Sequence, residues 1–145
     1  PTAFWVRLAN VFRAPLLLYL QGDLGTGKTT LPRRLLRGLG HHGAVKSPTF
    51  TLIEPYELDG VRIYDLDLYR VGDPGELEYL GLREMLADDA VILIEWPERG
   101  EGWLPSPDLW IRLRHQREGR RIELQAVTQR GETVLSALTQ DESAR

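Results

Sequence analysis

Cysteine is absent from the 145-residue chain. Disulfide bonds, zinc–thiolate sites and thiol nucleophiles are therefore excluded, and the absence fits a reducing compartment. Long apolar runs are missing too, because the longest are residues 16–20 and 91–94, far short of the roughly 20 residues that a transmembrane helix needs. No charged and then apolar leader precedes them. We therefore expect a soluble, cytoplasmic protein that has no membrane partner.

An excess of positive charge is also lacking. The chain has 18 lysine and arginine residues against 21 aspartate and glutamate residues, a formal net charge of −3 and an isoelectric point near 5.6. Sequence-independent binding of nucleic acid needs clustered cations at the phosphates. The composition therefore disfavours direct, unaided binding of RNA.

The length of the chain suits one domain with a single core. The sequence contains no internal repeat, no low-complexity tract and no linker. We therefore expect one domain over residues 1–145, with a tail that frays after about residue 136.

The apolar pattern predicts buried strands that alternate with helices. Residues 16–20 are apolar at every position, and so are residues 91–94, as in strands buried on both faces of a parallel sheet. Other segments carry apolar residues at helical spacing. They predict helices over residues 3–13, from Thr29 to Gly40, and from Asp73, a candidate N-cap, to about residue 87.

Four further stretches predict antiparallel strands. Residues 47–58 and 61–70 are separated by an Asp-Gly pair, which is a hairpin signal. Apolar and polar residues alternate over residues 109–114 and 121–126, which fits a second antiparallel pair with one wet face. Together the elements predict an α/β fold, with a central mixed, mostly parallel sheet flanked by helices and a C-terminal antiparallel hairpin.

A phosphate-binding loop connects the first buried strand to the helix that follows it. Gly22, Gly27, Lys28 and Thr29 match the pattern GxxxxGK followed by Ser or Thr, in the strand-to-helix context that the motif requires. Glycines let backbone N–H groups converge on phosphate oxygens, and the helix start adds its positive dipole end. Lys28 would reach the β and γ phosphates, and the Thr29 hydroxyl would hold Mg²⁺. The alternative is a glycine-rich turn with a solvated lysine.

Acidic residues at strand ends are candidates to complete such a site. Glu95 follows four apolar residues and would emerge at the carboxyl end of a parallel strand, where open α/β sheets bind ligands. Asp65 and Asp67 are two residues apart, so in a strand they share one face, and Tyr69 would continue that row. Mg²⁺ bound to phosphate would relieve the repulsion between such carboxylates. The alternative for each is a solvated strand acid.

Three further residues are candidates near the phosphates. Ser47 and Thr49 could form a phosphate-sensing loop, or they could simply begin a strand. Trp96 directly follows Glu95 and would border the nucleotide pocket. It also opens residues 96–108, where prolines and glycines predict a loop that borders a site.

Other missing features narrow the class of phosphate-loop protein. The chain has a single asparagine, Asn10, followed by valine, so the Asn-Lys-x-Asp loop of the usual GTPases is excluded. A transporter-type LSGGQ signature is absent as well. A small-molecule kinase and a non-hydrolysing, nucleotide-dependent binding module both remain open. The arginines available for the lid of such a kinase are Arg112, Arg114, Arg117, Arg120 and Arg121.

Five sequence blocks resemble one family. They are GDLGTGKTT at residues 22–30, VKSPTFTL at 45–52, DLYR at 67–70, DPGELEYLGL at 73–82 and IEWPER at 94–99. In this order and at these spacings they resemble the bacterial TsaE (YjeE-type) ATPases of tRNA threonylcarbamoyladenosine biosynthesis. The resemblance reaches across most of the chain and is far more specific than the phosphate loop alone.

The resemblance implies a phosphate-loop NTPase fold and roles for individual residues. Thr29 with Glu95 would hold Mg²⁺, Asp67 would lie near the γ-phosphate and bind metal-linked water or orient the nucleophile, and residues 47–50 would act as a switch. The implied catalytic residues are Lys28, Asp67 and Glu95, the metal ligands are Thr29, Glu95 and Asp67, and the ATP-binding residues are Gly22, Gly25, Thr26, Gly27, Lys28, Thr29, Thr30, Ser47, Thr49 and Trp96.

The resemblance also implies an activity. The family's weak ATPase works with the partner proteins TsaB and TsaD, resetting the complex that transfers threonylcarbamoyl to adenosine 37 of tRNAs that read codons beginning with A. By this resemblance the chain is not itself the transferase, and it contacts tRNA at most indirectly. Asp65 stands where the family usually has a histidine and Pro32 where it has a helix former, so no role of that imidazole carries over.

Overall fold

The computed structural model describes residues 7, 8, 10, 11, 13–22, 52–58, 61–69, 71–73, 75, 82–116 and 119–143. The elements within these residues are strands and helices that alternate along much of the chain. They are β1 (Leu16–Gly22), β2 (Leu52–Leu58), β3 (Val61–Asp67), α3 (Leu82–Ala87), β4 (Ala90–Glu95), the 3₁₀ helix η2 (Pro97–Gly100), β5 (Leu109–Gln116), β6 (Gly119–Ala126) and α4 (Gln129–Ser143).

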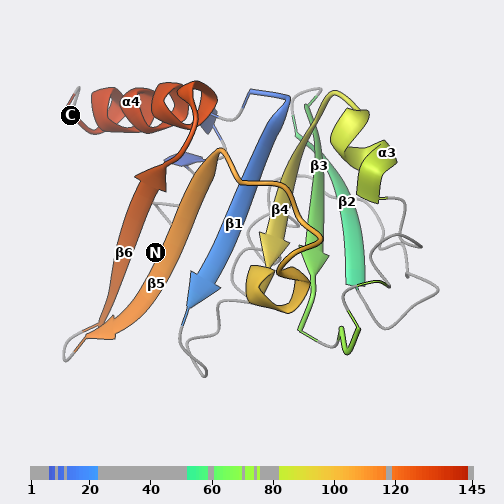
Figure 1. Cartoon of the computed structure of the whole chain (residues 1–145). Coiled ribbons are helices and arrows are strands. Elements are labelled where there is room, and N and C mark those ends of the chain that lie inside the picture. Colours follow the sequence, from blue (N-terminus) through green and yellow to red (C-terminus); the bar gives the residue numbers. More distant parts are fainter. Residues whose placement is uncertain are drawn as a thin grey trace.

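The strands form one sheet in the order β2-β3-β4-β1-β5-β6 (Figure 1). The central strands β3, β4, β1 and β5 are parallel, whereas β2 and β6 are antiparallel to their neighbours and form the two edges. The predicted mixed, mostly parallel sheet is therefore confirmed. Both predicted hairpins, β2–β3 and β5–β6, are confirmed as well.

Each face of the sheet carries its own apolar cluster. On the first face, Leu18 of β1 packs in a cluster that includes Val134 of α4. On the second face, Tyr19 of β1 packs in another cluster, against which Met85 of α3 lies. Successive side chains of a strand point to opposite faces, so a strand that is apolar throughout serves both clusters. The prediction that residues 16–20 are buried on both faces is confirmed.

The described residues include parts of two predicted helices, and both parts are helical. Arg7, Leu8, Asn10 and Val11 are helical, and Leu8 is fully buried, in agreement with a helix over residues 3–13. The predicted end of the next described helix, at about residue 87, is also confirmed. In the described part of the chain, no helix is long and apolar enough to cross a membrane.

Two predicted segments differ from the structure. Strand β3 ends at Asp67, so the prediction that the strand continues is wrong for Leu68 and Tyr69, and Tyr69 lies in a turn. The predicted fraying after about residue 136 is also wrong, because α4 continues to Ser143 and Leu138 is only 3% exposed. Leu138 lies one helical turn after Val134, and both are buried against the first face.

Candidate functional site

The carboxyl ends of two parallel strands bring the predicted acids Asp67 and Glu95 together. Asp67 is the last residue of β3, Glu95 is the last residue of β4, and the two are register partners. Neighbouring strands lie roughly 4.8 Å apart, and residues in register point to the same face. Both carboxylates therefore project from the first face at the carboxyl edge of the sheet, where the parallel strands end.

The strand that precedes the predicted phosphate loop ends close to Glu95. Glu95 is the register partner of Leu20 in β1, and β1 ends two residues later at Gly22, the first residue of the loop motif. In Figure 1 the arrowheads of β1, β3, β4 and β5 all point to the same edge. This carboxyl edge is where open α/β sheets bind their ligands.

The acids at this edge differ from ordinary strand acids in their burial. Glu95 is 0% exposed and Asp65 is 1% exposed, whereas Asp67 is half-buried. Burying a carboxylate costs several kcal/mol unless hydrogen bonds or a cation compensate. The solvated alternative therefore does not hold for Glu95 or Asp65.

A tight turn after Asp67 orients its carboxylate. Asp67 Oδ1 accepts a hydrogen bond from the Tyr69 N–H at 3.0 Å, and the Leu68 carbonyl oxygen accepts one from the Val71 N–H at 3.0 Å. Aspartate side chains commonly close such turns by bonding to the N–H two residues on. The prediction that Tyr69 continues the row of Asp65 and Asp67 is wrong, because the chain leaves the sheet here.

The chain reverses just as sharply after Glu95. Trp96 has φ 60° and ψ 51°, which is the left-handed region. For a residue other than glycine this conformation costs of order 1–3 kcal/mol, and such residues cluster at functional sites. The Leu68 N–H donates to the Glu95 carbonyl oxygen at 3.0 Å, and the Arg99 N–H donates to the Trp96 carbonyl oxygen at 3.0 Å. These bonds hold the reversal on both sides.

An aromatic contact joins the two turns. The rings of Tyr69 and Trp96 lie 4.8 Å apart, and the Arg99 guanidinium lies 5.8 Å from the centre of the Tyr69 ring. Tyr69 is 46% exposed, so this contact lies at the surface next to the acids. Sequence reasoning did not single out Arg99 or this contact. The signal available in the sequence was a pair of aromatic residues, Tyr69 two positions after Asp67 and Trp96 one position after Glu95.

The remaining site predictions fall outside the described residues. They concern the phosphate cradle beyond Gly22 and the segment predicted to sense the γ-phosphate. The residues are Gly25, Thr26, Gly27, Lys28, Thr29, Thr30, Ser47 and Thr49. Within the described ranges no group of three or more histidine, aspartate or glutamate residues is arranged to hold a metal. The predicted Mg²⁺ site combines two described acids, Asp67 and Glu95, with Thr29, which lies outside the described residues.

Four of the arginines considered for a kinase lid lie in regular strands, namely Arg112, Arg114, Arg120 and Arg121. The Arg112 guanidinium donates to Gln125 Oε1 at 2.8 Å, and Arg114 and Arg121 form ion pairs with Glu123 at 3.3 and 3.5 Å. These contacts run between β5 and β6 or along β6. These arginines therefore lie on a paired hairpin and not on a separate lid segment.

The chain is similar to known proteins over most of its length. A family model described as "Threonylcarbamoyl adenosine biosynthesis protein TsaE" matches residues 2–122. The "tRNA threonylcarbamoyladenosine biosynthesis protein TsaE" of Haemophilus influenzae is 48% identical over 124 residues, which cover 86% of this chain and 78% of that protein. The protein of the same name from Bacillus subtilis is 38% identical over 128 residues, with 88% and 80% covered.

A solved structure is similar over nearly the whole chain. The crystal structure of Bacillus subtilis YdiB matches with a TM-score of 0.73 and 31% sequence identity, covering 97% of this chain and 88% of that one. Together with the strand order, this likeness shows the predicted α/β fold of the phosphate-loop NTPase-like class.

Proposed function

The chain belongs to the TsaE family of threonylcarbamoyladenosine biosynthesis proteins, and from this premise we propose that it is a Mg²⁺-dependent ATP-binding protein with weak ATPase activity. The activity supports a cytoplasmic complex of TsaB and TsaD, which transfers threonylcarbamoyl to adenosine 37 of tRNAs that read codons beginning with A. The chain is not itself the transferase. It contacts tRNA at most indirectly, in keeping with its net charge of −3.

One observation carries this proposal. Asp67 and Glu95 are register partners at the carboxyl edge, and the strand next to Glu95 ends at Gly22, where the phosphate-loop motif begins. A triphosphate on that loop would therefore face both carboxylates. Carboxylate oxygens are ligands that Mg²⁺ prefers, so the described acids fit the ion.

Each residue has a distinct role in the proposed site. Lys28 contacts the β and γ phosphates, and Glu95 holds Mg²⁺ together with the Thr29 hydroxyl. When bound, Mg²⁺ neutralises the charge that develops on the phosphate oxygens. Asp67 orients the attacking water, and its hydrogen bond from the Tyr69 N–H fixes the carboxylate for this task. Hydrolysis then depends mainly on positioning and charge, as in other phosphoryl transfers.

Two substitutions test the assignment through different measurements. Lys28→Ala removes a phosphate contact, so we expect calorimetry to show Mg-ATP affinity reduced by about tenfold or more. Glu95→Gln keeps the shape but loses the charge that holds Mg²⁺, so we expect kcat for phosphate release to fall about 100-fold. Asp89→Asn, an exposed acid just before β4, is the matched control and should leave both values unchanged.

The same protein can be assayed for the competing functions. Incubation with γ-labelled ATP, with and without TsaB and TsaD, should release labelled phosphate, and more of it with the partners. Label on a small metabolite would instead indicate a kinase. Binding without any release under either condition would indicate a nucleotide-dependent binding module. Unchanged turnover in Glu95→Gln would rule out the metal assignment.

A further inference from the structure

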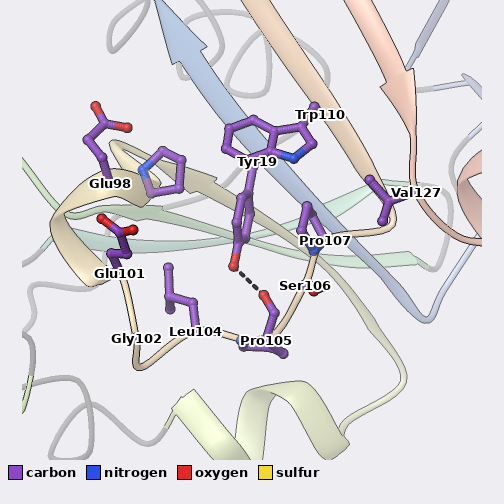
Figure 2. Close-up of a pocket in the computed structure, with 11 residues that line it drawn as sticks. Tyr19, Glu98, Glu101, Gly102, Leu104, Pro105, Ser106, Pro107, Trp110 and Val127 are labelled. Atoms are coloured by element: carbon purple, nitrogen blue, oxygen red, sulfur yellow. Dashed lines mark hydrogen bonds between the residues drawn. The ribbon is translucent and has the colours of Figure 1, made fainter.

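A pocket of about 440 Å³ lies on the second face of the sheet (Figure 2). Its floor is aromatic, because the rings of Tyr19 and Trp110 meet edge to face with centroids 5.0 Å apart. Its walls come from the segment that connects β4 to β5, and the Tyr19 hydroxyl donates a hydrogen bond to the Pro105 carbonyl oxygen. The pocket is therefore built by β1, β5, this connection and Val127, which follows β6.

The pocket is separate from the proposed nucleotide site. Tyr19 and Trp110 belong to the apolar cluster of the second face. Glu95 follows Leu93 at an interval of two residues, and Leu93 belongs to the cluster of the first face, so the two sites open on opposite faces. A role of the pocket in holding the triphosphate is also disfavoured by charge. Two of its described lining residues, Glu98 and Glu101, are acidic and none is basic.

The lining suits a cation on an apolar stem. An arginine side chain packs its methylene groups on apolar surface, stacks its guanidinium on aromatic rings and pairs with carboxylates. Trp110 already stacks with one such group of this chain, since the Arg112 guanidinium lies 4.4 Å from its ring centre. In Figure 2, Glu98 and Glu101 lie on one side of the Tyr19 ring and Pro107 lies on the other.

Two exposed apolar side chains lie in or next to the lining of the pocket. Trp103, next to the lining residue Leu104, is 49% exposed, and Val127, in the lining itself, is 47% exposed. Large apolar side chains exposed beside a pocket are characteristic of surfaces that bind other proteins. We propose that this pocket receives an arginine side chain of a partner protein, which pairs with Glu98 and Glu101.

The pocket lies close in sequence to Glu95, so a partner bound in the pocket could affect the proposed nucleotide site. This part of the inference rests on the proposed function. Glu98 lies in η2, which begins two residues after Glu95. The left-handed Trp96 and the bond from the Arg99 N–H to its carbonyl oxygen make this connection tight. A partner arginine that pairs with Glu98 and Glu101 holds η2, and thereby the Glu95–Trp96 junction, in place. Docking at the pocket then raises ATP turnover.

The chemistry of the pocket can be tested without nucleotide. N-acetyl-arginine amide should shift the NMR signals of the Trp110 indole N–H and the Gly102 amide in a saturable way, at least about threefold more tightly than the neutral citrulline amide. The double variant Glu98→Gln, Glu101→Gln should abolish this preference. The pair Asp89→Asn, Glu132→Gln, two exposed acids outside the lining, should retain it. Equal affinity for citrulline, or no saturable shift, overturns the proposal.

The partner is tested with the purified TsaB–TsaD pair. The double variant Glu98→Lys, Glu101→Lys reverses the charge of the pocket and should bind the TsaB–TsaD pair about tenfold more weakly or worse. The control double variant Asp89→Lys, Glu132→Lys should change the affinity for the pair by less than about twofold. Thermal unfolding of each variant checks that it is folded. If the wild type binds Mg-ATP and the reversed variant binds the pair as tightly, the pocket proposal fails and the proposed function stands. If the wild type neither binds nor hydrolyses ATP, the proposed function fails, and the arginine probe still decides the pocket.

Discussion

Glu95 and Asp67 differ in how much water reaches them. Glu95 is completely buried, whereas Asp67 is half-buried at a turn. A buried carboxylate gains most from a nearby cation, because low dielectric strengthens their attraction. A residue that orients attacking water must itself be accessible to water. The two exposures therefore support the proposed division, in which Glu95 holds Mg²⁺ and Asp67 orients the nucleophile.

Tyr19 gives a pH-dependent prediction. Burial raises the pKa of Tyr19 from its usual 10.0 to about 12. Between these values the unfolded tyrosine ionises while the folded one keeps its proton, so rising pH favours the unfolded state. The stabilising contribution of Tyr19 is complete below pH 10 and is lost as the pH rises through about 12. Between about pH 9 and about pH 11, the free energy of unfolding should therefore decrease less in Tyr19→Phe than in the wild type.

Urea unfolding at matched pH values measures this difference. Tyr69→Phe serves as the control, because it removes a hydroxyl from a side chain that is 46% exposed. The control should follow the wild type as the pH rises. If the Tyr19→Phe curve also runs parallel to the wild type, the buried hydroxyl makes no pH-dependent contribution and the expectation is wrong.

Individual site positions were predictable where local periodicity decides them. A strand alternates its side chains, so the shared face of Asp65 and Asp67 and the strand-terminal position of Glu95 could be predicted and are confirmed. The turn at Tyr69 and the left-handed Trp96 could not. Both form where the Leu68 N–H bonds to the Glu95 carbonyl oxygen, a contact between segments distant in sequence.

At the scale of elements, α4 was the main feature that sequence analysis missed. Thr128 precedes α4 and its Oγ1 accepts a hydrogen bond from the Gly131 N–H at 3.2 Å, which is an N-cap bond. The same hydroxyl donates to Asp108 Oδ1 at 2.5 Å, and Asp108 Oδ2 accepts from the Leu17 N–H at 2.8 Å. The cap is therefore tied to β1 by a residue 20 positions earlier in the chain.

The sequence of α4 explains why its residues are not predicted as a helix and why fraying is expected after about residue 136. A capping box would place Glu or Gln three residues after Thr128, where this chain has Gly131. Val134 and Leu138 do have helical spacing, and this was the signal available. Most helical stability in proteins comes from packing, and here it comes from burying these two residues on the first face.

Gly131→Ala sets helix propensity against this packing. A Cβ at Gly131 would lie 2.7 Å from the carbonyl carbon of Asp108 and closer still to its oxygen. Propensity alone favours alanine by about 1 kcal/mol, but the clash must push α4 away, so we expect a net loss of about 1–3 kcal/mol. Denaturant unfolding measures it. Ser136→Ala, exposed on the same helix, should change stability by less than about 0.5 kcal/mol, and a stabilised Gly131→Ala would contradict the argument.

At the scale of the whole molecule, the sheet type was predictable but the order of its strands was not. Wholly apolar strands indicate a parallel interior, as found for β1 and β4. Alternating strands indicate antiparallel pairing, as found between β5 and the edge strand β6, although β5 also pairs in parallel with β1. The position of β1 between β4 and β5 depends on crossover connections, which local patterns do not specify. That order places Glu95 beside Gly22, so the site depends on topology as much as on its residues.

Because the proposed site joins the ends of three neighbouring strands, its ligand should stabilise the molecule as a whole. A ligand that binds only the folded state adds about 2.7 kcal/mol at 100 times its Kd. For a chain of this size that corresponds to a rise in Tm of about 5–10 °C. Circular dichroism melts with Mg-ATP should show this rise, and melts with MgCl₂ alone should not. Lys28→Ala should lose about half of this rise or more at the same ligand concentration, because its affinity is about tenfold lower or weaker still. An equal rise in Lys28→Ala would mean that the nucleotide binds elsewhere than on the predicted loop.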